Sequence, residues 1–371
     1  MANLYNEGDL DVQPTTRSFN AVINAWGKSN EKNAAQKAED CLDWMEQLYE
    51  SGNDKVKPNT FNYNSVISAW AKSGQLGAAE RAEEILGRME ALYQAGDNDV
   101  KPNTISYNTC IDAWAKSGVE GSEQKAEELL HQMEQLYESG ENVDAKPNTR
   151  SYNSVINAYA KSRVDDAAKK AEDLLNKMEE MYNAGTYDIK PDAISFATVI
   201  NAWARSYSFG KADRVLNIFR RMVQLYKDGN KSVRPNVVLF NGVLNACAFT
   251  IGEPADQRRA VEIANLMLKE LELSPFGKPD QVTYGTYLKV CQNQMPECDT
   301  RHRLVDVVFK KCAKDGQVGN LVLSQMKSVL SESDYEKIVG KPMEESISLD
   351  DLPQEWSCNV VEGKRRRRHL H

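Results

Sequence analysis

Apolar residues recur along this chain at spacings of three and four, in short stretches that come in pairs. Residues 60–103 contain one such pair. The two stretches carry Tyr63, Val66, Ile67 and Trp70, and then Ala82, Ile85, Leu86, Met89, Leu92 and Tyr93. This spacing places the apolar side chains on one face of a helix. Each pair therefore predicts two amphipathic helices joined by a turn, and the lack of alternating strand patterns predicts an all-α fold.

The pair of helices returns every 44 or 45 residues. An aromatic residue and its successor mark the frame: Phe19-Asn20, Tyr63-Asn64, Tyr107-Asn108, Tyr152-Asn153, Phe196-Ala197, Phe240-Asn241 and Tyr284-Gly285. A fixed period of this length is typical of solenoids, in which stacking on a neighbour completes the core of each unit. We therefore predict a right-handed α-solenoid of stacked helix-turn-helix repeats, with function on the shared concave face.

The frame sets the expected boundaries along the chain. An N-terminal segment (1–15) precedes repeats at 16–59, 60–103, 104–148, 149–192, 193–236 and 237–280, and a degenerate start of a seventh at 281–295. A C-terminal helical cap is expected at 296–340 and a flexible polar tail at 341–371. The tail ends in Lys364-Arg365-Arg366-Arg367-Arg368, a run that fits a nuclear address, an additional phosphate contact or a plain solvated tail.

Composition narrows the class of protein without deciding it. The 371 residues carry a net charge of −8, which is unusual for a protein that binds phosphate chains. No run approaches the roughly 20 apolar residues of a membrane-spanning helix, and the first sixteen residues hold three acidic and no basic side chains, so no transit or secretory signal is expected. Seven scattered cysteines argue for a reducing compartment.

No catalytic constellation is visible, and we expect neither an enzyme nor a cofactor. Cys291, Cys298, His302 and Cys312 could be imagined around zinc, but their spacings match no standard site. Buried thiols and a surface histidine explain them better, so no metal site is expected.

The polar face of the first helix carries a repeated signal. Counting four and eight residues on from each frame position gives an amide, a small polar group and a cation: Asn20, Asn24, Lys28; Asn64, Ser68, Lys72; Asn108, Asp112, Lys116; Asn153, Asn157, Lys161; Ala197, Asn201, Arg205. Residues four apart lie above one another on a helix. The cations also suit a helix C-terminus, and the amides could bond the neighbouring repeat, but amides also read base edges. We therefore expect Lys28, Lys72, Lys116, Lys161 and Arg205 to bind phosphates.

The run Tyr63-Asn64-Ser65-Val66-Ile67-Ser68-Ala69-Trp70-Ala71-Lys72-Ser73-Gly74 and the closing Val100-Lys101-Pro102-Asn103 resemble the pentatricopeptide repeat. The resemblance covers about residues 16–295, and it implies binding of single-stranded RNA at about one base per repeat, usually in mitochondria or chloroplasts. It places the first base-reading residue on Asn20, Asn64, Asn108, Asn153, Ala197 and Asn241. It places the second on the last residue of each repeat: Asn59, Asn103, Asn148, Asp192, Asn236 and Asp280.

The resemblance also implies side chains that stack between bases. They fall on Phe61, Ile105, Ile194, Val238 and Val282, with Arg17 and Arg150 departing from the apolar pattern, although an Arg plane can still stack on a base. In this family Asn with a terminal Asp tends to select uracil, and Asn with a terminal Asn accepts pyrimidines with a lean to cytosine. Repeats four and six are thus expected to select uracil, and repeats one to three a pyrimidine.

The unit is about nine residues longer than usual for this family, which leaves the spacing of one base per repeat open. The expected partner is pyrimidine-leaning single-stranded RNA bound by a monomer, with RNA processing, stability or translation as the process. The alternative is a protein-binding solenoid, which would use the same face for a peptide or helix. The acidic total favours that alternative, whereas the recurring Asn and terminal Asn or Asp favour RNA. The compartment is expected to be a mitochondrion or chloroplast, with the nucleus open because of the basic run.

Overall fold

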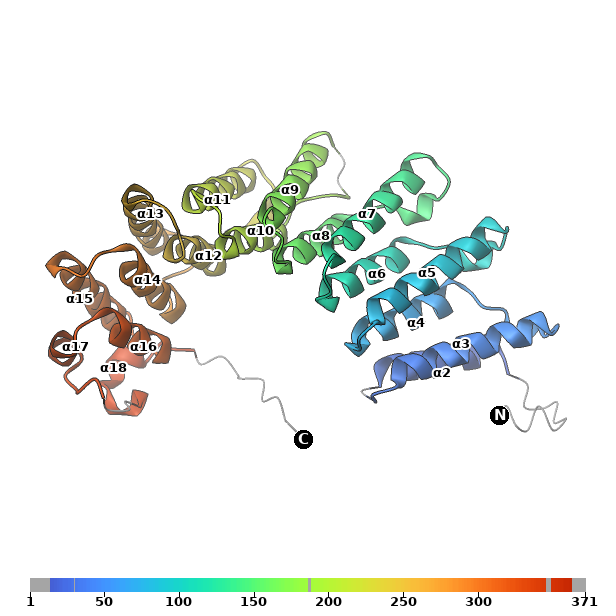
Figure 1. Cartoon of the computed structure of the whole chain (residues 1–371), viewed down its shortest axis with the longest axis horizontal. Helices are drawn as coiled ribbons and strands as arrows, with labels where there is room; N and C mark the ends of the chain where they lie inside the picture. Colours follow the sequence, from blue (N-terminus) through green and yellow to red (C-terminus); the bar gives the residue numbers. More distant parts are fainter. Residues whose placement is uncertain (1–13, 30, 186–187, 345–347, 362–371) are drawn as a thin grey trace. The chain divides into compact units, whose positions relative to one another are not determined.

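The structure, a computed structural model, describes residues 14–29, 31–185, 188–344 and 348–361. Within these ranges every regular element is a helix, so the all-α class predicted from the sequence is confirmed (Figure 1). The chain divides into two compact units, Met1–Pro191 and Asp192–His371, which are described separately. The basic run Lys364–Arg368 lies outside the described residues. In the part that is described, no helix is long and apolar enough to cross a membrane.

The first unit is a stack of helical hairpins, each made of a first and a second helix. They are α2 (Thr16–Lys28) and α3 (Ala34–Glu50), α4 (Thr60–Ser73) and α5 (Ala78–Gln94), α6 (Thr104–Ser117) and α7 (Ser122–Glu138), and α8 (Thr149–Lys161) and α9 (Ala167–Asn183). The first helices pack on one another in the order α2, α4, α6, α8 (Figure 1). Each second helix packs against its own first helix, and α3, α5 and α7 also contact the next one. The first helices thus form an inner row and the second helices an outer layer.

The second unit continues the pattern with α10 (Ala193–Arg205) and α11 (Lys211–Lys227), then α12 (Val237–Ala248) and α13 (Pro254–Leu273). It ends in α14 (Gln281–Gln294), α15 (Asp299–Lys314), α16 (Asn320–Val329), α17 (Glu332–Val339) and α18 (Gln354–Ser357). Helices α10, α12, α14 and α16 pack in sequence along one row.

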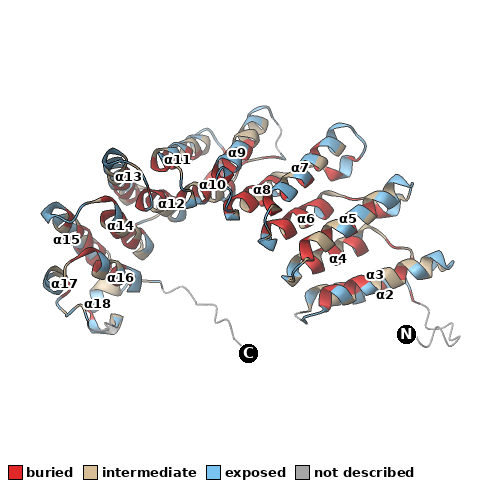
Figure 2. Ribbon diagram, in the orientation of Figure 1, coloured by how far each residue is buried: buried red, intermediate tan, exposed pale blue. Residues whose placement is uncertain are grey.

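The core lies between the two layers, where the apolar stripes meet (Figure 2). The frame aromatics Tyr63, Tyr107 and Tyr152 are fully buried, as is the methionine that recurs in each second helix: Met45, Met89, Met133, Met178, Met222 and Met267. Burial of the stripe removes apolar surface from water at every repeat contact. Stacking rather than one central core therefore holds each unit together.

Half-buried carboxylates of the outer layer form hydrogen bonds with side chains of the next repeat. Tyr107 on α6 donates its hydroxyl to Glu90 of the preceding repeat at 2.6 Å, and Gln132 of α7 donates to the same Glu90 at 2.8 Å. Burial and the Glu90 carboxylate raise the pKa of Tyr107 far above its ordinary value. One repeat upstream, Tyr63 bonds Glu46, which also pairs with Arg88. Removing one member would leave a buried polar partner unsatisfied, so these bonds fix the register between repeats.

A short 3-10 turn lies between the second helix and the Pro that ends the repeat in repeats one, two, three and five. In the third repeat this is Val143–Ala145, and Ala145 is buried. Asn142 donates to the carbonyl of Pro102 in the preceding linker at 2.8 Å, and Thr104 Oγ1 donates to the Lys146 carbonyl at 2.7 Å. The additional length therefore adds bonds between successive repeats.

The C-terminal region differs from the sequence prediction in its last described residues. Residues 296–340, expected to be helical, hold α15, α16 and α17, and α15 packs against α14. Residues 348–361, expected in an irregular tail, include the 3-10 turn Leu349–Asp351 and α18. Trp356 of α18 meets Phe309 edge to face at 5.4 Å between ring centroids, and its carbonyl accepts from Val318 N–H at 2.8 Å. A single aromatic anchor in a polar stretch gives no helical periodicity, so the pattern could not reveal it.

Candidate functional site

The last residue of each repeat caps the first helix of the next. Asn103, for example, accepts hydrogen bonds at Oδ1 from the backbone N–H groups of Ile105 (3.0 Å) and Ser106 (3.2 Å), and Ser106 Oγ accepts from Asn103 N–H (3.1 Å). The same position caps the helix in every repeat that the resemblance singled out: Asn59, Asn103, Asn148, Asp192, Asn236 and Asp280. A cap of this kind holds the side chain in one orientation at the start of the inner helix.

The two residues expected to read one base lie together in three of the repeats. Asn64 Nδ2 donates to Asn103 Oδ1 at 3.3 Å, and Asn108 Nδ2 to Asn148 Oδ1 at 3.4 Å. In the second unit Asn241 Nδ2 donates to Asp280 Oδ1 at 3.3 Å. The members of each pair are 39 or 40 residues apart in sequence. The structure thus brings together side chains that only the repeat frame connects.

A third residue, which the sequence reading missed, belongs to this group. It stands three positions after the cap and bonds the amide of the preceding repeat in two cases: Asn62 donates to Asn20 Oδ1, and Thr283 Oγ1 lies 2.7 Å from Asn241 Oδ1. The signal was available, because a short polar residue three positions after an Asn or Asp is a capping box. The amides therefore do bond the neighbouring repeat, which was the structural alternative. The bonds position the amides and leave other atoms of each pair unused.

The first members of the pairs differ in exposure. Asn20, Asn64 and Asn241 are half-buried, whereas Asn108 is only 4% exposed. A ligand at the third repeat would therefore meet Asn148 first. Oδ1 of Asn64 and Oδ1 of Asn108 are buried atoms that find no donor among the described residues. Buried acceptors are rarely left without a partner, so these two oxygens are unsatisfied acceptors at the reader positions.

The side chains expected to stack on bases project from the first turn of each first helix. Five apolar members of the set are exposed: Phe61, Ile105, Ile194, Val238 and Val282. Arg150, which departs from the apolar pattern, is exposed as well and pairs with Asp112 at 2.6 Å. Asp112 stands where other repeats have Asn or Ser, and Arg150 stands where they have an apolar residue. The charges of these two unusual residues therefore compensate each other. Arg17 is exposed at the first turn of α2.

The cations of the ridge lie in the last turn of the first helices, and all are exposed: Lys28, Lys72, Lys116, Lys161 and Arg205. Among the described residues no carboxylate pairs with them, although Lys161 Nζ lies 3.3 Å from the Ala115 carbonyl oxygen. The linker lysines differ, since Lys57 pairs with Asp99 at 2.6 Å and Lys101 with Asp144 at 2.7 Å. The inner row therefore keeps cations available to an anionic ligand.

In repeat four the two readers are divided between the two units, and repeat five lacks the amide reader. Asn153 belongs to the first unit and Asp192 to the second, so their geometry is not described together. In repeat five Ala197 supplies no amide, and Asn236 caps α12 through Leu239 N–H at 3.1 Å. The site is thus described in repeats two and three of the first unit and in repeat six of the second.

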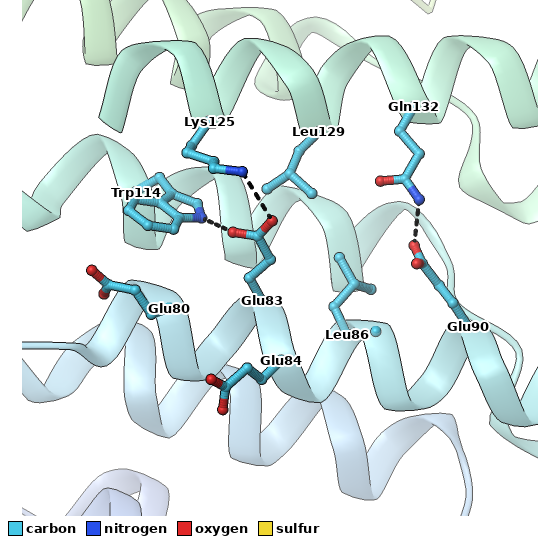
Figure 3. A pocket seen from close by; sticks show the side chains of 10 residues that line it. Glu80, Glu83, Glu84, Leu86, Glu90, Trp114, Lys125, Leu129 and Gln132 are labelled. Atoms are coloured by element: carbon cyan, nitrogen blue, oxygen red, sulfur yellow. Dashed lines mark hydrogen bonds and ion pairs between the residues drawn. The ribbon is translucent and has the colours of Figure 1, made fainter. Parts of the chain in front are cut away.

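The outer layer has the opposite charge character. A groove of about 470 Å³ between α5 and α7 is lined by Glu80, Glu83, Glu84 and Glu90 (Figure 3). Trp114 Nε1 donates to Glu83 at 2.8 Å, and Lys125 Nζ lies 3.9 Å from the same carboxylate. These acidic groups repel phosphates. The net charge of −8 is therefore compatible with an inner row that attracts them.

The zinc ligands considered from the sequence do not assemble. Cys291 and Cys312 are buried and Cys298 is exposed. Within the described ranges, no three His, Cys, Asp or Glu side chains are grouped so as to hold a metal ion.

Comparison with known proteins gives a consistent result. The family model of the pentatricopeptide repeat domain matches residues 48–117, 92–162 and 174–250, together more than half of the chain. The crystal structure of the pentatricopeptide repeat protein PPR10 from maize has a similar fold, with a TM-score of 0.55 and 20% sequence identity over 89% of this chain. This chain spans only 39% of that one. None of the curated proteins matches the sequence.

The frame aromatics, the caps that end each repeat and the stacked hairpins thus agree with the family match. The chain belongs to the pentatricopeptide repeat family, a family of RNA-binding helical-repeat proteins.

Proposed function

We propose that this chain binds single-stranded RNA and selects its sequence, with the paired side chains of the inner row reading one base each. The observation that carries the proposal is the recurring pair, Asn64 with Asn103, Asn108 with Asn148 and Asn241 with Asp280, at 3.3–3.4 Å. Exposed apolar side chains flank these pairs, and the first helices of repeats two and three end in the cations Lys72 and Lys116, which have no carboxylate partner among the described residues. Stacking surfaces, polar readers and cations are the three parts that recognition of unpaired bases requires.

The cap decides which atom of the second reader faces a base. Asn103 must turn its oxygen toward the backbone N–H groups of Ile105 and Ser106, because a side-chain NH₂ could not accept from them. Its Nδ2 is then the remaining polar atom, and it is a donor. Asp280 likewise uses Oδ1 to accept from Thr283 N–H at 2.8 Å. Its Oδ2 remains, and it is an acceptor.

This difference supports a base preference. At the ring nitrogen N3 of a pyrimidine, cytosine is an acceptor and uracil carries a proton that it can donate. A repeat that ends in Asn therefore offers a donor that suits cytosine, and a repeat that ends in Asp offers an acceptor that suits uracil. On this basis repeats one to three favour pyrimidines with a lean to cytosine, and repeats four and six favour uracil. Repeat five, with Ala197, is the least selective.

We place this activity in organellar RNA processing, stability or translation, in a mitochondrion or a chloroplast. Membership of the pentatricopeptide repeat family supports the compartment, since members are typically organellar. A monomer suffices, because each described reader pair lies within one chain.

The test is a binding titration with one pyrimidine-rich RNA oligonucleotide, alone and annealed to its complement. We expect the single strand to bind and the duplex to bind at least about tenfold more weakly, because duplex bases cannot reach the reader pairs. A double variant, Asn64→Ala with Asn241→Ala, should reduce the affinity for the single strand. Equal affinity for both forms, or no binding of either, would contradict the proposal and favour a protein-binding solenoid.

A further inference from the structure

Exposed aromatic side chains gather at two successive turns of the second unit. The turn 206–210 joins α10 to α11 and carries Tyr207 and Phe209, which are 88% and 76% exposed. The next such turn begins with Phe249, 48% exposed, at the end of α12. Helices α10 and α12 pack side by side, so the turns at their C-terminal ends are neighbours. Single exposed apolar residues are ordinary on a protein surface, but three rings on adjacent turns form a patch.

Alignment of the first helices by their reader positions shows that one ring of the patch stands where the other repeats have a cation. Eight residues after the reader Asn241 stands Phe249, the position that holds a cation in the other repeats: Lys28, Lys72, Lys116, Lys161 and Arg205. In repeat five the cation Arg205 is present, and Tyr207 follows two residues later. The patch therefore lies where the other repeats place the cations that the proposed function assigns to phosphates.

A buried lysine side chain forms hydrogen bonds with the backbone of the turn that carries Tyr207 and Phe209. Lys211 is buried, and its Nζ donates to the carbonyl oxygens of Ser206 at 2.7 Å and Ala204 at 3.2 Å. The corresponding residues of other repeats are small: Ala78, Ser122 and Ala167. These hydrogen bonds fix the backbone of the turn, whereas the rings of Tyr207 and Phe209 remain outside the core. A ring on a fixed backbone loses less conformational entropy when a ligand binds.

We propose that Tyr207, Phe209 and Phe249 form a stacking site for unpaired bases of single-stranded RNA, with Arg205 contacting the adjoining phosphate. The site binds nucleotides without regard to sequence. It spans the turn of repeat five, where Ala197 supplies no reading amide, and the turn of repeat six. It rests on the proposed function and adds a second kind of contact to it. Aromatic faces accept any base, and a neighbouring cation holds the backbone.

The charge and the position of the patch favour RNA over a protein as its ligand. Arg205 is exposed and has no carboxylate partner among the described residues, so the patch attracts an anionic chain. Within the second unit, the patch lies at the C-terminal ends of α10 and α12, two first helices that pack side by side. A strand bound to the reader pair Asn241 and Asp280 lies against α12, the helix that ends at Phe249.

The experiment uses the full chain and two single-stranded oligonucleotides of equal length and different pyrimidine order. We expect the double variant Tyr207→Ser with Phe249→Ser to bind both RNAs at least about tenfold more weakly, since each stacked base contributes a factor of about five or more. The matched control is Leu76→Ser, which removes a 97% exposed side chain from the equivalent turn of repeat two and should leave binding unchanged. Tyr207→Phe keeps the ring and should also bind as wild type does.

Crosslinking provides a second measurement that does not depend on a variant. Wild-type chain irradiated with RNA that contains 4-thiouridine should form adducts within residues 206–210 or at Phe249. If wild type binds RNA but the double variant binds equally well, or no adduct forms at these turns, the stacking site is wrong and the proposed function stands. A loss of affinity for only one of the two sequences would overturn the claim that the site ignores sequence. If wild type binds neither RNA, the proposed function fails and this site fails with it.

Discussion

The side chain at the end of each repeat caps a helix, and this role determines how the same side chain would act in the proposed reading of a base. Asn103 and Asp280 cap helices with one oxygen, so the orientation of the other polar atom follows from backbone hydrogen bonding. In the proposed function, the selection of a base therefore depends on the remaining atom, the NH₂ group of Asn103 or the second oxygen of Asp280. Since Asn and Asp are about equally good caps, evolution or design can exchange them with little effect on the fold.

Asp280→Asn should therefore change base preference and leave stability nearly unchanged. The variant keeps the cap of α14 and replaces an acceptor by a donor, so the position read by repeat six should shift from uracil toward cytosine by about 1 kcal/mol. Selection from a randomised RNA pool, carried out on both proteins, measures the shift. The same change at Asp192 should alter the position read by repeat four. An identical preferred motif for wild type and Asp280→Asn would show that this side chain does not face a base.

The control for this variant is Asp280→Ala, which removes both roles. It should lower the stability of the second unit by about 1 kcal/mol, because the N–H of Thr283 loses its acceptor. Denaturant titration of the three proteins separates the two effects. If Asp280→Asn is destabilised as much as Asp280→Ala, the cap argument is wrong.

Lys211 leads to a pH-dependent prediction. Burial lowers the pKa of its amine from 10.5 to about 8 in the folded chain. Between these values the unfolded chain binds more protons, so the contribution of Lys211 to stability rises with pH. The free energy of unfolding of wild type minus that of Lys211→Met should increase by about 1 kcal/mol from pH 8 to pH 9. Denaturation of both proteins at each pH measures this difference, in which other titrating groups cancel. A difference that stays constant or falls would contradict the assignment.

At the scale of the elements, periodicity predicted the hairpins well and their ends less well. The stripe of Ala82, Ile85 and Met89 was sufficient to place a second helix, which the structure extends to Gln94. Packing decided what periodicity could not. Helix α18 depends on one contact between Trp356 and Phe309, and the burial of Asn108 depends on side chains that surround it in space. The pairing of Asn64 with Asn103 could be anticipated, because the repeat frame already assigns both residues to the same repeat.

The contribution to stability of the hydrogen bond between Tyr107 and Glu90 can be measured by removing the hydroxyl of Tyr107. Tyr107→Phe deletes the hydroxyl that donates to Glu90 and should lower the free energy of unfolding by about 2 kcal/mol, since a hydrogen bond to a charged group in a buried place is lost. The matched control is Tyr49→Phe, because Tyr49 is half-buried and its hydroxyl has no hydrogen-bond partner among the described residues. Denaturant midpoints at constant slope give both values. Equal effects of the two changes would show that the bond does not couple the repeats.

At the scale of the whole molecule, the positions of the charges indicate where an anionic ligand could bind better than the net charge does. The acidic groups of the outer layer are engaged with their neighbours, as Glu83 is with Trp114 and Lys125. The inner helices end in cations such as Lys72 and Lys116, which have no carboxylate partner in the described ranges. A net charge of −8 therefore lowers the attraction of an anionic chain at long range, whereas the proposed phosphate contacts depend on these local cations.

Salt dependence can test this separation directly. Lys72→Gln should weaken the binding of every single-stranded RNA to a similar extent and reduce the slope of log affinity against log salt by about 0.7, the value for one phosphate contact on a single strand. Lys125→Gln removes the same charge from the outer layer, where Lys125 lies 3.0 Å from Glu128. Its effect on affinity should be small, and the slope should stay as in wild type, because no phosphate contact is lost. Titrations of the three proteins over a range of salt concentrations give the slopes. If both variants reduce the slope equally, the cations act through total charge rather than by contact, and the inner row is not the path of the RNA.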